Sequence, residues 1–253
     1  MHLDRRNLLI AAIASAITAC SEPAASNTAR VAVAANFTAP AREIAAAFEQ
    51  GTGHRAVLSF GSSGAFYAQI SQGAPFDIFL SADAEKPRRI VAEGLAPASE
   101  LFTYAIGRLA LYSTHAGLVD ERGDVLRTGD FARIAIADPE LAPYGAAAVE
   151  AMNKLGVRER LASRIVQGTS IAQAFQFVSS GAADLGFVAQ SQIADIEGGS
   201  RWLLPDDLHG RIEQQAVLLA TAGDNPVAGA FARFLKSAEA RTVIARYGYT
   251  VPA

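Results

Sequence analysis

Strand-like and helix-like runs alternate along this chain from about residue 31. Short apolar runs at 31–35, 56–60 and 77–82 are each bounded by turn-forming residues. Between them, 39–50 and 65–72 carry apolar residues at helical spacing, and a glycine follows each of these two runs. Strands that alternate with helices form parallel sheets, because the helix supplies the crossover between strands. The sequence therefore predicts an α/β protein whose sheets are mostly parallel and flanked by helices.

The same rhythm continues into a second half of the chain. No stretch rich in proline, glycine and serine divides the two halves. Two lobes must then be joined by strands that cross between them, which we place near residues 105 and 215. We predict a first lobe of residues 30–106 plus 216–253 and a second lobe of residues 107–215. The further runs are a long strand at 105–112, strands at 134–137, 185–189 and 214–220, helices at 145–155 and 171–180, and two closing helices within 226–247.

The first nineteen residues have the pattern of a signal peptide. Arg5 and Arg6 precede an apolar segment at 8–19 that is too short to cross a bilayer as a helix. The segment ends at Cys20 in a pattern typical of bacterial lipoproteins. We predict removal of residues 1–19, lipidation of Cys20, a polar tether at 20–29 and a periplasmic location. Ordinary cleavage that discards Cys20 is the alternative, and general and twin-arginine export both stay open.

The net charge and the cysteine content limit the classes of function that the chain can have. The net charge at pH 7 is −3, which is unlike that of proteins that bind nucleic acid or anionic membranes. Cys20 is the single cysteine, so no disulfide framework holds the chain together. Any binding of an anion must arise from local dipoles, because the overall charge opposes it.

Four short segments share one design, in which small or hydroxyl residues lead into the first turn of a helix. Such a turn presents unpaired N–H groups and about half a positive charge. In open α/β sheets these turns lie beyond the carboxyl ends of strands, where ligands bind. Two segments come from each half of the chain, so a cleft between lobes would join them into a cage for a small anion. The segments are AANFTAP (34–40), FGSSG (60–64), PYGA (143–146) and GTSI (168–171).

Each candidate residue also has an ordinary structural explanation. Asn36 and Ser63 are of types that commonly cap helices. Tyr144 could be a partly buried aromatic residue with a hydrated hydroxyl. The side chain of Ile171 suits a core, so only its backbone N–H group would bind a ligand. The occurrence of all four at strand–helix junctions is what favours an anion site.

A serine hydrolase is the alternative from a different class. Segment 61–64 follows a strand and resembles the turn that carries a nucleophilic serine, with Ser63 as the candidate, although it does not satisfy G-x-S-x-G. The nucleophile needs a histidine base, and His54, His115 and His209 lie in apparent loops away from any motif. No cysteine–histidine cluster, phosphate-binding loop or dinucleotide motif is present. We therefore expect a protein that is not an enzyme and has no cofactor.

Taken in order, several segments resemble the periplasmic molybdate-binding proteins of ABC transporters. The resemblance implies a type II periplasmic-binding-protein fold, whose two lobes close on an anion in the cleft and deliver it to a membrane permease. Matched by motif, the ligand contacts are Asn36 and Ser63 in the first lobe and the backbone N–H groups of Tyr144 and Ile171 in the second. Some members use a tyrosine where this chain has Ala189, so one donor is missing or replaced. The segments are 34–40, 59–64, 77–83, 137–139 with 142–145, and 246–249.

Molybdate suits a site built only of donors. It is a fully deprotonated tetrahedral dianion, so molybdenum would be held only as this oxyanion. Hydrogenphosphate carries a proton that needs an acceptor, and burying it unmatched costs about 1–3 kcal/mol. Sulfate matches molybdate in charge, which leaves a sulfate receptor as the alternative within the same class. We expect a monomer that binds molybdate, with tungstate as a second ligand.

Overall fold

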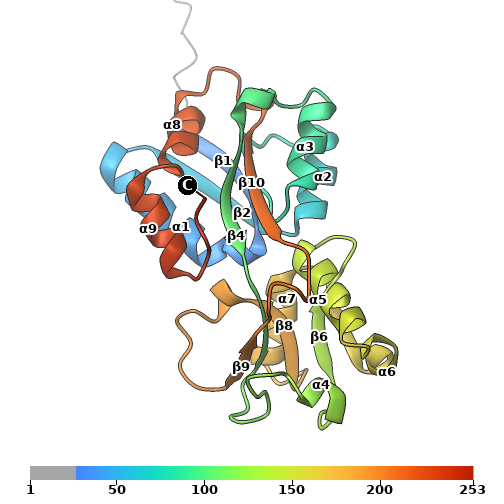
Figure 1. Ribbon diagram of the computed structural model, residues 1–253. Helices are drawn as coiled ribbons and strands as arrows, with labels where there is room; N and C mark the ends of the chain where they lie inside the picture. The colour runs from blue at the N-terminus through green and yellow to red at the C-terminus, as the bar shows by residue number, and fades with distance from the viewer. Residues whose placement is uncertain (1–26, 253) are drawn as a thin grey trace, which may run out of the picture.

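The computed structural model describes residues 27–252, and these form two lobes, each built on a five-stranded sheet (Figure 1). The predicted signal peptide and Cys20 lie outside the described residues. None of the described helices has the length and apolar character needed to cross a membrane. In each sheet one strand runs against the other four, so the sheets are mixed but mostly parallel.

The sheet of the first lobe has helices on both faces. Its strand order is β2-β1-β3-β10-β4. Neighbouring residues of one strand enter different cores, because side chains alternate across a sheet: Ile78 packs under α1, α8 and α9, whereas Phe79 packs under α2 and α3. Figure 1 shows these two groups of helices on opposite sides of the sheet. The elements are β1 (Thr28–Ala34), η1 (Ala35–Phe37), α1 (Thr38–Thr52), β2 (Arg55–Gly61), α2 (Ser63–Ser71), β3 (Ile78–Leu80), α3 (Glu85–Ala92), η2 (Ala98–Glu100), β4 (Leu101–Gly107), β10 (Ile212–Leu218), η5 (Ala220–Ala222), α8 (Pro226–Phe234) and α9 (Ala238–Arg246).

The second lobe repeats this plan with one large core. Its strand order is β7-β6-β8-β5-β9. Strands β5, β6 and β8 are buried along their whole length, as expected for strands covered on both faces. The elements are β5 (Leu109–Ser113), α4 (Val125–Thr128), β6 (Ile134–Ala137), α5 (Pro143–Lys154), α6 (Arg158–Leu161), η3 (Ala162–Arg164), β7 (Ile165–Gly168), α7 (Ile171–Ser179), β8 (Leu185–Ala189), η4 (Gln190–Gln192) and β9 (Ser200–Leu203).

The chain crosses between the lobes twice. The first crossing passes through Arg108 alone, between β4 and β5, and the second runs through residues 204–211. The long strand expected at 105–112 is therefore two strands in two sheets. The expected boundary between residues 215 and 216 falls inside β10, which pairs with β4 from Ile212 onward and so belongs to the first lobe.

Candidate functional site

All four candidate residues line one small cavity between the lobes. Asn36 and Ser63 reach it from the first lobe, and Tyr144 and Ile171 from the second. The volume is about 10 Å³, which is room for about one water-sized group, so a larger anion requires a small separation of the lobes. None of the described residues that line it is charged. They are Ala34, Ala35, Asn36, Gly61, Ser62, Ser63, Ala82, Ala142, Pro143, Tyr144 and Ile171.

The N-termini of helices lie at this cavity because local residues there end each strand and cap the helix that follows. Ser62 caps α2 by accepting a hydrogen bond from the N–H group of Ala65 at 3.4 Å. Ser170 caps α7 in the same way, accepting from Gln173 at 3.3 Å. Pro143 opens α5, where its missing N–H group costs nothing.

The backbone N–H groups of the four candidate residues have no acceptor within the described part of the chain. They belong to the first turns of η1, α2, α5 and α7, where a helix cannot supply an internal partner. Ser62 accepts from the N–H group of Ala65 in the first turn of α2, and Gln173 accepts from the N–H group of Thr169 just before α7. The four groups are therefore available to a ligand.

Ser63 is arranged as a donor. Its Oγ accepts a hydrogen bond from the N–H group of Ala82 at 2.9 Å, and its side chain is buried. That bond uses a lone pair of the oxygen and leaves the hydroxyl proton available, and no acceptor for this proton is found among residues 27–252. An anion in the cavity would provide the acceptor.

Small residues allow the lobes to approach closely. The N–H group of Gly64 donates to the carbonyl of Leu141 across the cleft at 2.9 Å. A Cβ atom on Gly64 would lie 3.0 Å from Leu141, and one on Gly145 would lie 2.3 Å from the carbonyl oxygen of Ala137. Glycine at 145 therefore lets the start of α5, with Tyr144, press against the end of β6.

The Asn36 amide is held by other side chains. Its Nδ2 donates to Gln214 Oε1 and to the Tyr249 hydroxyl, both at 2.9 Å. Its Oδ1 is buried and has no hydrogen-bond partner in the described structure. The family resemblance implies that Asn36 contacts the ligand, but here both protons of its side-chain amide go to protein acceptors. The backbone N–H group of Asn36 is its free donor.

A buried polar network lies behind the cavity and was not predicted from the sequence. Gln214 accepts from the Tyr104 hydroxyl at 2.9 Å and donates to the Tyr144 hydroxyl at 3.0 Å. Tyr249 donates to the Asn36 carbonyl, and Ser191 of the second lobe does the same, at 2.9 and 2.8 Å. Burial raises the pKa of Tyr249 to about 12 and raises those of Tyr104 and Tyr144 well above their usual value. All three are therefore neutral near pH 7.

Two signals in the sequence could have indicated this network. Gln214 and Gln215 are polar residues in a run that is otherwise apolar, QQAVLLA. Tyr249 belongs to the closing RYGY segment that supports the family resemblance. Ala189, where some members have a tyrosine, is not among the residues that line the cavity.

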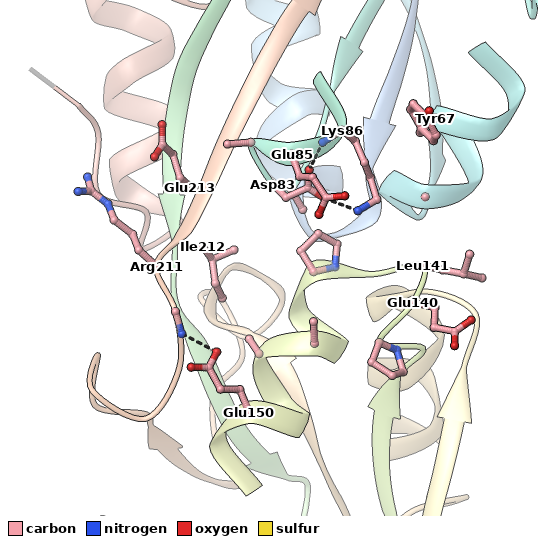
Figure 2. Close-up of a pocket in the computed structure, with 18 of the residues that line it drawn as sticks. Tyr67, Asp83, Glu85, Lys86, Glu140, Leu141, Glu150, Arg211, Ile212 and Glu213 are labelled. Atoms are coloured by element: carbon pink, nitrogen blue, oxygen red, sulfur yellow. Dashed lines mark hydrogen bonds and ion pairs between the residues drawn. The ribbon is translucent and has the colours of Figure 1, made fainter. Parts of the chain in front are cut away.

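A wider pocket of about 590 Å³ opens beside the cavity, between the lobes (Figure 2). Its lining includes five carboxylates and three cationic side chains. Lys86 lies 3.0 Å from a carboxylate oxygen of Asp83, and Gly210 donates to Glu150 at 2.8 Å, as the dashed lines in Figure 2 indicate. A predominantly acidic pocket does not attract anions, so the attraction has to come from the dipoles of the cavity itself.

The other sequence candidates have structural partners. Asp83 accepts from the N–H group of Lys86 at the start of α3, and Asp138 accepts from the N–H group of Glu140 in a turn. Ser63 has Ala82 as its hydrogen-bond partner, while His209 pairs with the carbonyl of Gly210. Residues 27–252 contain no group of histidine, cysteine and carboxylate side chains that could hold a metal ion.

Comparisons with known proteins match both lobes. The family described as bacterial extracellular solute-binding proteins matches residues 29–250. The molybdate-binding protein ModA of Rhodobacter capsulatus is 52% identical over 227 residues, which are 90% of this chain and 90% of that protein. ModA of Azotobacter vinelandii is 48% identical over 244 residues, 95% of this chain and 96% of that protein. The solved periplasmic molybdate-binding protein of Azotobacter vinelandii has a TM-score of 0.86 at 40% identity and covers 89% of this chain and 100% of its own.

Proposed function

This chain belongs to the family of bacterial extracellular solute-binding proteins, and we propose that it binds molybdate in the cavity between its lobes. The observation that carries the proposal is that four helix starts, two from each lobe, line one cavity without a charged side chain. The names of the close relatives support the choice of molybdate among anions.

The chemistry of the cavity supports the same ligand. Molybdate only accepts hydrogen bonds, and the free groups at the cavity are four backbone N–H groups and the Ser63 hydroxyl. Charge-assisted hydrogen bonds contribute about 1.5–3 kcal/mol each, so five give roughly 8–15 kcal/mol before the costs of ordering and closure. The remainder corresponds to a dissociation constant in about the micromolar to nanomolar range.

Closure of the lobes is the change by which a transporter would recognise the ligand-bound protein. Three of the five free donors come from the first lobe and two from the second, so a bound anion favours the closed arrangement over an open one. We propose that the closed protein, as a monomer in the periplasm, delivers molybdate to the permease of an ABC transporter. Lipidation of Cys20 stays a prediction, and the mass of the mature N-terminus would decide it.

Calorimetric titration of the purified protein with molybdate, tungstate, sulfate and hydrogenphosphate tests the proposal. We expect tight binding of molybdate and tungstate and binding at least tenfold weaker for the other two anions. Asn36→Ala should weaken molybdate binding about tenfold or more, because it removes the amide that Gln214 and Tyr249 hold at the cavity and, with it, a donor to a charged ligand. Failure of the unmodified protein to bind molybdate would refute the proposal, and tight binding of sulfate alone would assign a sulfate receptor instead.

A further inference from the structure

Gln214 occupies the centre of the network behind the cavity. It lies on β10, where the register of pairing with β4 shifts between Gln214 and Gln215, and its side chain is fully buried. Its Oε1 accepts from Asn36 and Tyr104, and its Nε2 donates to the Tyr144 hydroxyl. This one amide therefore joins a candidate residue of the first lobe to a candidate residue of the second.

The atom of the Asn36 amide that lacks a protein partner is the one that a ligand can use. In the described arrangement that atom is Oδ1, because Gln214 and Tyr249 hold both protons of Nδ2. An oxygen without a donor is costly when buried, by about 1–3 kcal/mol, and it would repel an anion. An anion needs the N–H groups of this amide instead.

Reversal of both amides gives Asn36 Oδ1 the donors that it lacks. Tyr249 would donate to Oδ1 instead of to the Asn36 carbonyl, which keeps its hydrogen bond from Ser191. Gln214 Nε2 would then donate to Asn36 Oδ1, which lies in the place that Nδ2 now occupies. Tyr144 would donate to Gln214 Oε1, and Tyr104 would keep its hydrogen bond to the Ser81 carbonyl, now 3.1 Å. An N–H group of Asn36 would become free. Asn36 cannot turn in this way unless Gln214 turns with it, because otherwise two N–H groups or two oxygens would face each other.

We propose that Gln214 is a positioning residue of the anion site, which sets whether the Asn36 amide offers an acceptor or a donor and links that choice to Tyr144. This inference rests on the proposed function. Anion binding selects the reversed pair, in which Asn36 donates. The linkage crosses from one lobe to the other, so the state of the amides depends on how Tyr144 is placed by the second lobe.

The surroundings of Gln214 support a dedicated role. A Cβ atom on Gly107 would lie 2.1 Å from the Tyr144 hydroxyl and 2.5 Å from Gln214 Nε2, so only glycine at the end of β4 leaves room for this hydrogen bond. The titratable groups that face Gln214 are Tyr104, Tyr144 and Tyr249. All three have a raised pKa and stay protonated at neutral pH, so each can donate or accept as the amides require.

Gln215 provides a matched control. It is the next residue of the same strand and is also buried, but its amide donates to Thr103 and Glu213 at 3.2 and 3.1 Å, away from the cavity. Gln215→Met removes the same amide from the same strand as Gln214→Met. Both variants lose buried hydrogen bonds, so both should lose stability, but only one touches the network behind the cavity.

The test is a double-mutant cycle on molybdate affinity, with the melting temperature of the ligand-free protein measured alongside. We expect Gln214→Met to raise the dissociation constant at least tenfold, Tyr144→Phe to raise it severalfold, and the double variant to be no weaker than the weaker single variant. Gln215→Met should stay within threefold of the unmodified protein. In the unmodified protein, molybdate should shift the side-chain ¹⁵N–¹H resonances of Asn36 and Gln214 together.

Two results would overturn the inference while the unmodified protein still binds molybdate. One is unchanged affinity in Gln214→Met, and the other is a double variant whose loss is the product of the two single losses. If Gln214→Met does not fold, Tyr144→Phe tests the same hydrogen bond from the second lobe by removing a single oxygen atom. If the unmodified protein does not bind molybdate, the proposed function fails first.

Discussion

Two adjacent serines allow ligand binding to be separated from helix capping. Ser62 and Ser63 are both buried at the start of α2. Ser62 accepts from the N–H group of Ala65 and so stabilises the helix, whereas Ser63 accepts from Ala82 and keeps its own proton free. We predict that Ser63→Ala weakens molybdate binding, while Ser62→Ala mainly lowers the stability of the ligand-free protein.

The magnitudes follow from the type of hydrogen bond that is lost. A bond to a charged acceptor contributes about 1.5–3 kcal/mol, which corresponds to roughly a tenfold to 150-fold increase in the dissociation constant of Ser63→Ala. Loss of a helix cap costs about 0.5–2 kcal/mol of stability. The Ser62 bond is long at 3.4 Å, so the lower part of that range applies.

Calorimetry with molybdate and thermal unfolding without it would be run on both variants and on the unmodified protein. A Ser63→Ala variant that folds and binds molybdate as tightly as the unmodified protein would refute the reasoning. So would an equal loss of affinity in the two variants, since it would show that the helix start acts through its conformation and not through the Ser63 hydroxyl.

Three further predictions test other parts of the site. Gly145→Ala should destabilise the protein by about 1–3 kcal/mol and weaken molybdate binding, because the added Cβ meets the Ala137 carbonyl oxygen at 2.3 Å and pushes Tyr144 away. A melting curve and a titration would show the two effects. An unchanged melting temperature and an unchanged affinity would contradict the close approach. Hydrogenphosphate should fail to displace molybdate at tenfold excess, because no carboxylate lines the cavity; efficient competition would contradict the donor-only site. Stability should fall between pH 10 and pH 12, because the pKa of buried Tyr249 is raised from 10.0 to about 12 and the unfolded chain loses that proton first; a flat profile of the unfolding free energy over this range would contradict the burial.

The helix starts at the cavity could be predicted because their signals are local. Small or hydroxyl residues and the short apolar runs before them act within a few residues, so the starts of α2, α5 and α7 lie within two residues of the expected positions. That these starts lie at one cavity followed from the two-lobed arrangement, which the alternating pattern and the absence of a linker indicated and the family resemblance supported.

The network behind the cavity could not be predicted in the same way. Asn36 bonds to Gln214 and to Tyr249, which lie 178 and 213 residues away in sequence, and no local pattern encodes such pairs. The division of the expected strand at 105–112 into β4 and β5 at Arg108 also could not be predicted, for a similar reason. Strands β4 and β5 follow each other with one residue between them, so the sequence reads as a single extended run although the two halves pair in different sheets.

The order of strands in the first sheet has a consequence for how the exported chain folds. The second lobe is continuous in sequence, from β5 to β9, whereas the first lobe needs β10 between β3 and β4. Until β10 arrives, the edges of those two strands are unpaired, and unpaired edges invite association with other chains. A chain that ends before Ile212 should therefore retain a folded second lobe and aggregate through its first.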